Sequence, residues 1–141
     1  MSVFIIAEIS ANHNQNLDLA LQTVQAAIDA GADAIKVQTF KPESMALDVD
    51  NAIFGPKTYG AWKGWRPWDL YKKAALPYEW HKPIQEMTLA SGKEFFSSPF
   101  DADAVAFLQD LGVSRYKIAS FEINDVPLIH AVAQTLKPLI L

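Results

Sequence analysis

Apolar and polar positions along the chain follow two alternating patterns. Short apolar runs indicate strands, and the first of them, residues 3–8 (VFIIAE), has the continuous pattern of a strand covered on both faces. Longer segments carry apolar residues at helical spacing, as Leu17, Leu21, Val24 and Ile28 do. The expected strands are residues 3–8, 33–38, 93–97, 115–119 and 138–141. The expected helices are residues 17–30, 77–90, 102–111 and 126–136, with a short one near 68–75.

Capping residues sharpen several of these boundaries. Gly31 and Gly112 follow the first helical pattern and the 102–111 pattern, where a glycine commonly ends a helix. Asp101 stands directly before the 102–111 helix, and aspartate is a preferred N-cap. The element order is therefore β-α-β-α-β-α-β-α-β, which predicts parallel strands joined by right-handed crossovers.

Two architectures fit that order. A doubly wound sheet usually has a glycine-rich first turn, and the turn after the first strand here, Ser-Ala-Asn-His, is not one. In a (β/α)8 barrel, polar residues gather at the carboxyl ends of successive strands. Such residues follow four strands here: Glu8; Lys36 and Gln38; Ser98; and Lys117, Ser120 and Glu122. We therefore predict a TIM barrel.

The 141 residues hold four βα units and a fifth strand, whereas a complete barrel needs about 250 residues. We expect residues 1–141 to be the N-terminal portion of a TIM-barrel domain in a longer protein. Residues 39–76 form an unusually long connection rich in tryptophan and tyrosine. That connection is either a lid over a ligand or aromatic packing over the barrel rim or another subunit.

Two lysines carry the main chemical signal. Lys36 and Lys117 lie on the second and fourth strands, and alternate strands of a barrel contribute side chains to a shared layer. Two ammonium groups at one depth repel unless an anion lies between them. We predict a phosphate or carboxylate ligand, with Ser98 and Ser120 as hydroxyl donors. The alternative is that each lysine forms a structural ion pair with a nearby glutamate.

The histidines, the absence of cysteine, the net charge and the lengths of the apolar runs exclude several classes of function. His13 reads as a hydrogen-bonding loop residue, and His81 and His130 as structural or surface residues, so spacing builds no metal site. There is no cysteine, and the net charge of −4 with no basic stripe argues against nucleic acid. No apolar run approaches a membrane span and no leader is apparent, so we expect a cytoplasmic protein.

Four ordered motifs then resemble one enzyme family. They are EISANH (residues 8–13), GADAIKVQT (31–39), FSSPF (96–100) and YKIASFE (116–122). This set resembles the nonulosonic acid synthases, which include the sialic acid synthases and their relatives for legionaminic and pseudaminic acid. The residues of these motifs are most similar to those of the pseudaminic acid synthase branch.

The resemblance implies a reaction and a set of roles. Members of the family condense phosphoenolpyruvate with an N-acylated amino sugar and release phosphate. By resemblance, Lys36, Ser98, Lys117 and Ser120 would bind phosphoenolpyruvate, and Glu8 and Gln38 would contact the sugar. Glu122 would move protons in catalysis, with Glu8 and Lys117 as the other catalytic candidates.

The resemblance also implies parts that this chain lacks. A divalent metal, Mn²⁺ or Mg²⁺, would be held by ligands outside residues 1–141. The rest of the barrel and a C-terminal antifreeze-like domain would complete the site in a homodimer. We therefore expect the isolated chain to be inactive. A Schiff-base aldolase acting through Lys117 or Lys36, and a non-catalytic half-barrel that associates through its exposed strands, remain alternatives.

Overall fold

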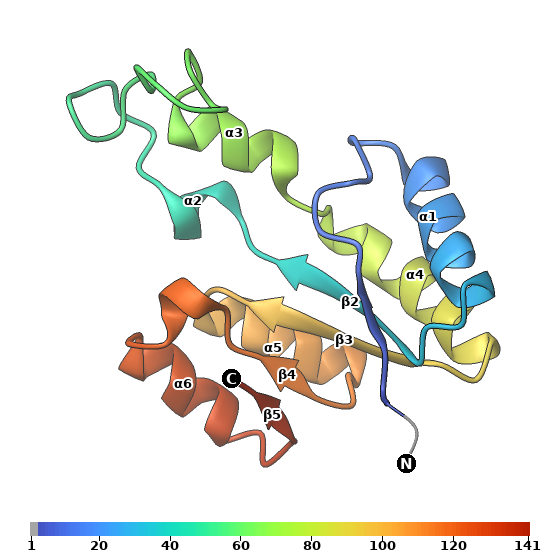
Figure 1. Cartoon of the computed structure of the whole chain (residues 1–141). Helices are drawn as coiled ribbons and strands as arrows, with labels where there is room; N and C mark the ends of the chain where they lie inside the picture. Colours follow the sequence, from blue (N-terminus) through green and yellow to red (C-terminus); the bar gives the residue numbers. More distant parts are fainter. Residues whose placement is uncertain (1–2) are drawn as a thin grey trace.

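The computed structural model describes residues 3–141 and contains one parallel five-stranded sheet (Figure 1). Its strands are β1 (Ile6–Glu8), β2 (Ala34–Thr39), β3 (Glu94–Pro99), β4 (Tyr116–Lys117) and β5 (Leu139–Ile140). The spatial order is β1-β2-β3-β4-β5, the same as the order in sequence. A doubly wound sheet would reverse direction at a switch point, so this order is that of a partial barrel, as predicted.

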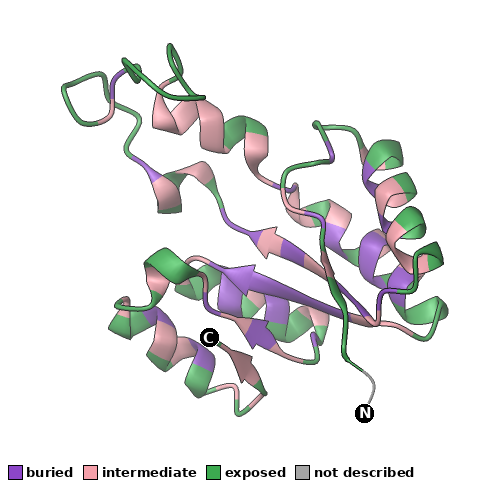
Figure 2. Cartoon of the chain, viewed as in Figure 1, coloured by how far each residue is buried: buried purple, intermediate pink, exposed green. Residues whose placement is uncertain are grey.

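Four helices cover one face of the sheet. They are α1 (Leu17–Asp29), α4 (Tyr78–Ala90), α5 (Ala102–Leu111) and α6 (Val126–Ala133). Their buried side chains, among them Val24, Ile84 and Leu108, form one core with the strand residues Ile35 and Phe95. The two central strands β2 and β3 are largely buried, whereas β1 and β5 are not (Figure 2). Because side chains alternate along a strand, Lys36 and Gln38 occupy the opposite face of β2.

Helix ends follow the capping pattern. Asp101 accepts a hydrogen bond from the backbone nitrogen of Ala104, which confirms it as the N-cap of α5. Gly112 ends that helix with φ 79°, a conformation that favours glycine. Asn16 caps α1 in the same manner as Asp101, by accepting from the backbone nitrogen of Leu19. No helix among residues 3–141 is long and apolar enough to cross a membrane.

Three sequence predictions were wrong in extent. The first strand covers only Ile6–Glu8, and Val3, Phe4 and Ile5 are exposed, because β1 is an edge strand here with no neighbour on its outer side. The last helix stops at Ala133 and not at residue 136, where Leu136 has φ 56°. The fourth strand is only two residues long and leads into a 3₁₀ turn, η1 (Ser120–Glu122).

The long connection between β2 and α4, residues 41–76, is folded and is called the insertion below. It contains α2 (Pro42–Met45), which was not predicted, and α3 (Pro67–Ala74), close to the predicted short helix. Arg66 links the segment after α2 to the start of α3, since its guanidinium lies 2.7 Å from Asp48 and 2.8 Å from Asp69. Figure 1 shows the insertion beyond the carboxyl ends of the strands.

Candidate functional site

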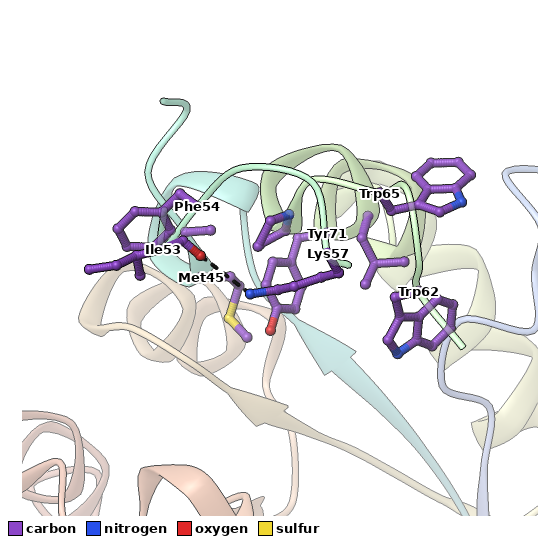
Figure 3. Close-up of a pocket in the computed structure, with 10 residues that line it drawn as sticks. Met45, Ile53, Phe54, Lys57, Trp62, Trp65 and Tyr71 are labelled. Carbon is purple, nitrogen blue, oxygen red and sulfur yellow. Dashed lines mark hydrogen bonds between the residues drawn. The ribbon is translucent and has the colours of Figure 1, made fainter. Parts of the chain in front are cut away.

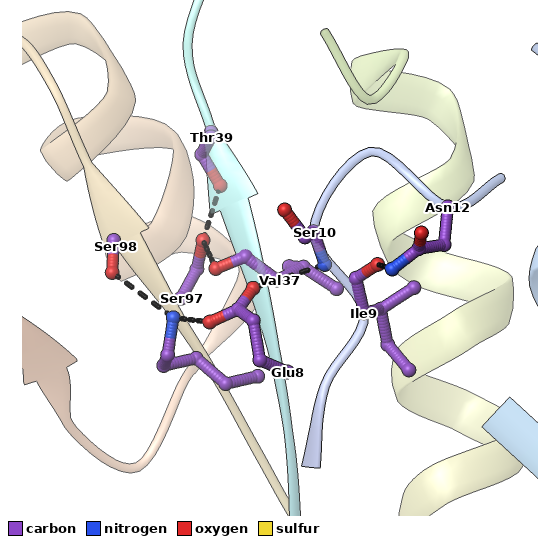
Figure 4. Close-up of polar contacts among 9 residues, drawn as sticks. Glu8, Ile9, Ser10, Asn12, Val37, Thr39, Ser97 and Ser98 are labelled. Atoms are coloured by element: carbon purple, nitrogen blue, oxygen red, sulfur yellow. Dashed lines mark hydrogen bonds and ion pairs between the residues drawn. The ribbon is translucent and has the colours of Figure 1, made fainter. Parts of the chain in front are cut away.

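The predicted polar residues of β1 and β2 are in direct contact. Glu8 is the register partner of Lys36, and the two form an ion pair (Figure 4). The other carboxylate oxygen of Glu8 accepts a hydrogen bond from the backbone nitrogen of Ser10 over 3.0 Å. Ser10 has φ 52°, so the chain turns sharply after β1 and brings that nitrogen back to the carboxylate. The ion pair is the structural alternative that the sequence left open for Lys36.

Lys36 also reaches the third strand. Its ammonium nitrogen lies 3.4 Å from the hydroxyl of Ser98, to which it donates. Burial, followed by the positive charge of Lys117, lowers the pKa of Lys36 to about 8. A pKa of about 8 leaves the ammonium form predominant at neutral pH, which is the form that pairs with the carboxylate of Glu8. Lys117 therefore contributes to the electrostatic surroundings of Lys36.

Glu122 completes this group from the turn after β4. Burial raises the pKa of its carboxyl group, against the opposing charge of Lys117. One of its oxygens, Oε2, is buried and has no hydrogen-bond partner. A carboxyl group in such surroundings holds a proton more readily than an exposed glutamate does. Ser120, the first residue of η1, is exposed and is not brought into contact with the lysines.

A cavity of about 670 Å³ lies over the strand ends. Gln38 and Glu122 line it, together with Ser10 from the turn after β1. Glu8, Lys36 and Ser98 form a contiguous contact set. The structure thus gathers most of the predicted site residues at one end of the sheet.

Behind the sheet lies a polar network that the sequence did not predict. The hydroxyl of Thr39 is 2.7 Å from Nε2 of His81. It is also 2.6 Å from the hydroxyl of Ser97 (Figure 4). The hydroxyl of Ser97 also lies 3.1 Å from the carbonyl oxygen of Val37, and all three side chains of the network are fully buried. The sequence did carry a signal for this network. Thr39 and Ser97, the neighbours of Gln38 and Ser98, place hydroxyl groups on the otherwise apolar, helix-facing side of two buried strands.

Geometry fixes the protonation of this network. The carbonyl oxygen of Pro77 lies 3.2 Å from Nδ1 of His81 and can only accept, so Nδ1 carries the proton. Nε2 then accepts from Thr39, and the single hydroxyl proton of Ser97 is shared between the oxygen of Thr39 and the carbonyl oxygen of Val37. Burial lowers the pKa of His81 to about 4, so the ring is neutral at pH 7. His81 is therefore structural, as the sequence predicted.

The other histidines also follow the sequence prediction. His13 is buried in the loop after β1, where its Nε2 bonds to the carbonyl oxygen of Ala74 and its Nδ1 accepts from the backbone nitrogen of Gln15. Burial lowers the pKa of His13 as well. His130 lies on the surface of α6. Within residues 3–141, no three His, Cys, Asp or Glu side chains cluster as a metal site would require.

Comparison with known proteins identifies relatives over nearly the whole chain. A model of the NeuB family matches residues 23–141. Pseudaminic acid synthase of Campylobacter jejuni is 46% identical over 138 residues, which are 98% of this chain and 40% of that protein. The N,N'-diacetyllegionaminic acid synthase of Legionella pneumophila is 39% identical over all of this chain and 39% of its own length.

A solved structure shares the fold. The N-acetylneuraminic acid (sialic acid) synthetase of Leptospira borgpetersenii, crystallised with citrate, superposes with a TM-score of 0.79 at 31% identity. The match covers 99% of this chain and 44% of that one. The chain therefore spans about two-fifths of the length of the relatives it matches.

Proposed function

Because this chain belongs to the NeuB family, we propose that it forms the first half of the active site of a nonulosonic acid synthase. The enzyme would join phosphoenolpyruvate to an N-acylated amino sugar and release phosphate. The relatives named for pseudaminic and legionaminic acid synthesis support this class of product. Their names favour a pseudaminic acid-type sugar, since that synthase has the higher identity of the two.

The observation that carries the proposal is the pair of lysines at the strand ends. Tyr116 pairs in register with Ser97 on the helix-facing side, so the next residue, Lys117, lies on the opposite face with Lys36, and its charge contributes to the lowered pKa of Lys36. Phosphoenolpyruvate brings a phosphate and a carboxylate, so its binding would relieve that repulsion. Ser98, already bonded to Lys36, would add a hydroxyl donor. Ser120 would join them only if the η1 turn moved towards the ligand.

The chemistry proceeds in two bond-forming steps. The C2–C3 π electrons of phosphoenolpyruvate attack the aldehyde carbon of the open-chain sugar, and the aldehyde oxygen takes a proton to become a hydroxyl. Water then adds to C2 and loses one proton to give a tetrahedral intermediate. The C2–O bond to phosphate breaks with its electron pair leaving on phosphate, and the new hydroxyl loses its proton to become the C2 carbonyl. The products are the nonulosonic acid and inorganic phosphate.

Two glutamates are placed to serve these proton transfers. Glu122, whose pKa is raised by burial, would exchange the proton during water addition or phosphate loss. Glu8 would hold a sugar hydroxyl together with Gln38, while its ion pair keeps Lys36 oriented. Lys117 would be the cation nearest the leaving phosphate.

The proposal also includes parts beyond the described residues. A divalent metal would be supplied by ligands elsewhere in the protein, since the described part of this chain does not fit one. When bound, it would polarise the sugar aldehyde. A homodimer working in the cytoplasm, where phosphoenolpyruvate is made, is the assembly we propose from the family resemblance.

Removing the charge of Lys117 tests the proposal. In the full-length protein, Lys117→Ala should lower phosphate release by about a hundredfold or more, because a charge-assisted contact to the phosphate is lost. Calorimetry should show weaker binding of phosphoenolpyruvate, with circular dichroism unchanged. Lys82→Ala, which removes an exposed lysine from α4, is the matched control. Near-normal phosphate release by Lys117→Ala would refute the assignment.

The lowered pKa of Lys36 favours a second candidate, a Schiff-base aldolase. An amine with a pKa of about 8 is partly neutral at pH 7 and can attack a carbonyl. The contact with Glu8 weighs against it, since an ion pair stabilises the unreactive ammonium form. Borohydride treatment with a carbonyl substrate distinguishes the two: an adduct on Lys36 or Lys117 supports the aldolase, and the synthase predicts none.

A further inference from the structure

Trp62, near the tip of the insertion, lines three neighbouring cavities. It borders the cavity of about 670 Å³ over the strand ends and a pocket of about 300 Å³ inside the insertion (Figure 3). It also borders a pocket of about 260 Å³ beside the loop that follows β1. The side chain is 56% exposed, so a large part of its ring is available to a ligand.

The strand-end cavity has two chemically different sides. Its strand side carries the polar groups of Ser10, Gln38, Glu122 and Asp125, with the rings of Phe40, Phe100 and Phe121 among them. Its insertion side, here called the apolar wall, consists of Met45, Trp62, Leu70 and Tyr71. A ligand that matched both sides would carry hydroxyl groups on one part and an apolar substituent on another.

The end of α3, the helix that carries Leu70 and Tyr71 of the apolar wall, is bonded to the loop after β1. Nε2 of His13 donates to the carbonyl oxygen of Ala74 over 3.2 Å. The side chain of Gln15 donates to the carbonyl oxygens of Lys73 and Ala75, over 2.9 and 2.8 Å. These bonds fix the end of α3 to the loop that also carries Ser10. Leu70 and Tyr71, on the same helix, are therefore positioned relative to the strand ends.

Resting on the function proposed above, we propose that the apolar wall binds the N-acyl substituent of the amino-sugar substrate, with Trp62 and Tyr71 as specificity-determining residues. The sugar hydroxyls face the polar side of the cavity, and the acyl methyl group packs on the indole of Trp62. Burying a methyl group against a half-exposed aromatic ring removes apolar surface of both from water. An unacylated amino sugar would place a charged ammonium group there.

Trp65 differs from Trp62 in the cavities that it lines. It belongs to the same insertion, is 40% exposed, and lines the two smaller pockets but not the strand-end cavity. The ammonium group of Lys73 lies 5.2 Å from the centre of its ring. Trp65 therefore already has a partner on one face and does not reach the proposed sugar site.

The test compares these two tryptophans in the full-length protein. Trp62→Ala should raise KM for the N-acetylated sugar about five- to tenfold, the value of one good aromatic contact, and leave KM for phosphoenolpyruvate unchanged. Trp62→Phe should restore most of the loss. Trp65→Ala should change neither KM. With the unacylated sugar, Trp62→Ala should have little effect, because the contact in question is absent.

An unchanged KM for the acylated sugar in Trp62→Ala would overturn the proposal, as would an equal rise for Trp65→Ala. If the wild-type protein neither binds phosphoenolpyruvate nor releases phosphate, the proposed function itself fails. Direct binding of acylated and unacylated amino sugars to wild type and Trp62→Ala then decides the role of the wall. Tighter binding of the acylated sugar, lost on Trp62→Ala, supports it; equal binding overturns it.

Discussion

The hydroxyl oxygen of Thr39 lies 2.7 Å from Nε2 of His81, and both side chains are fully buried behind the sheet. Thr39 is also bonded to Ser97 on the neighbouring strand, so the network extends to β3. Gln38 and Ser98, the immediate neighbours of these residues in sequence, point to the opposite face of the sheet. The network therefore stabilises, from the helix-facing side of the sheet, the strand ends that carry the candidate site.

Thr39→Val should destabilise the fold. The substitution keeps the shape of the side chain but leaves Nε2 of His81 buried without a donor, which costs about 1–3 kcal/mol. The free energy of unfolding in urea measures the change. Thr39→Ser retains the hydroxyl and should lose much less. If valine and serine have the same effect, the hydrogen bond is not the source of the stability.

Stability should fall in mild acid because of His81. Its pKa is about 4 in the folded protein against an ordinary value of 6.5, so between these pH values the unfolded chain binds more protons. The contribution of His81 to the free energy of unfolding is therefore complete above pH 6.5. It declines towards pH 4, by about 3 kcal/mol at most.

Urea unfolding at pH 7 and pH 5 checks that slope. His81→Gln should remove most of the pH dependence, although His13, whose pKa is also lowered, will leave a part of it. A wild-type slope that survives His81→Gln intact would contradict the prediction.

Glu122→Gln should impair the chemical step selectively. The amide cannot exchange a proton, so kcat should drop by about a hundredfold while KM for phosphoenolpyruvate changes little. The raised pKa of Glu122 predicts an acid limb in the wild-type pH–rate profile above the usual range of a glutamate, and the variant should lack it. Glu79→Gln, exposed on α4, is the control. A persistent limb would assign it to another group.

Residues 1–141 produced alone should not release phosphate from phosphoenolpyruvate and an acylated amino sugar. The described residues offer no metal cluster and match about two-fifths of the related synthases. Phosphate release above the rate of a Lys117→Ala version of the same chain would disprove this. Size measured against concentration in the same preparation tests whether the chain associates through its exposed strand edges.

The strand ends could be predicted because two local signals agree there. Each short apolar run stops at a polar residue, and parallel strands bring those residues to one edge, so the pattern alone predicts Lys36, Ser98 and Lys117 there. The parallel order could be predicted from the alternation of helices and strands. Both inferences depend only on sequence pattern.

The contacts between side chains could not be predicted in this way. The pairing of Glu8 with Lys36 depends on the register of β1 against β2, which the pattern leaves open. The network of Thr39 depends on where α4 places His81, 42 residues later. The early end of the last helix reflects a local turn at Leu136, although leucine normally favours a helix.

The bonds from His13 and Gln15 to the end of α3 also bear on the order in which the chain folds. They join residues 58 to 61 positions apart, so they can form only after a long loop has closed. The carbonyl groups that they satisfy are those that a helix leaves free at its own end. The insertion should thus order late and open first, as a local unit with less protection from hydrogen exchange than the strands it overhangs.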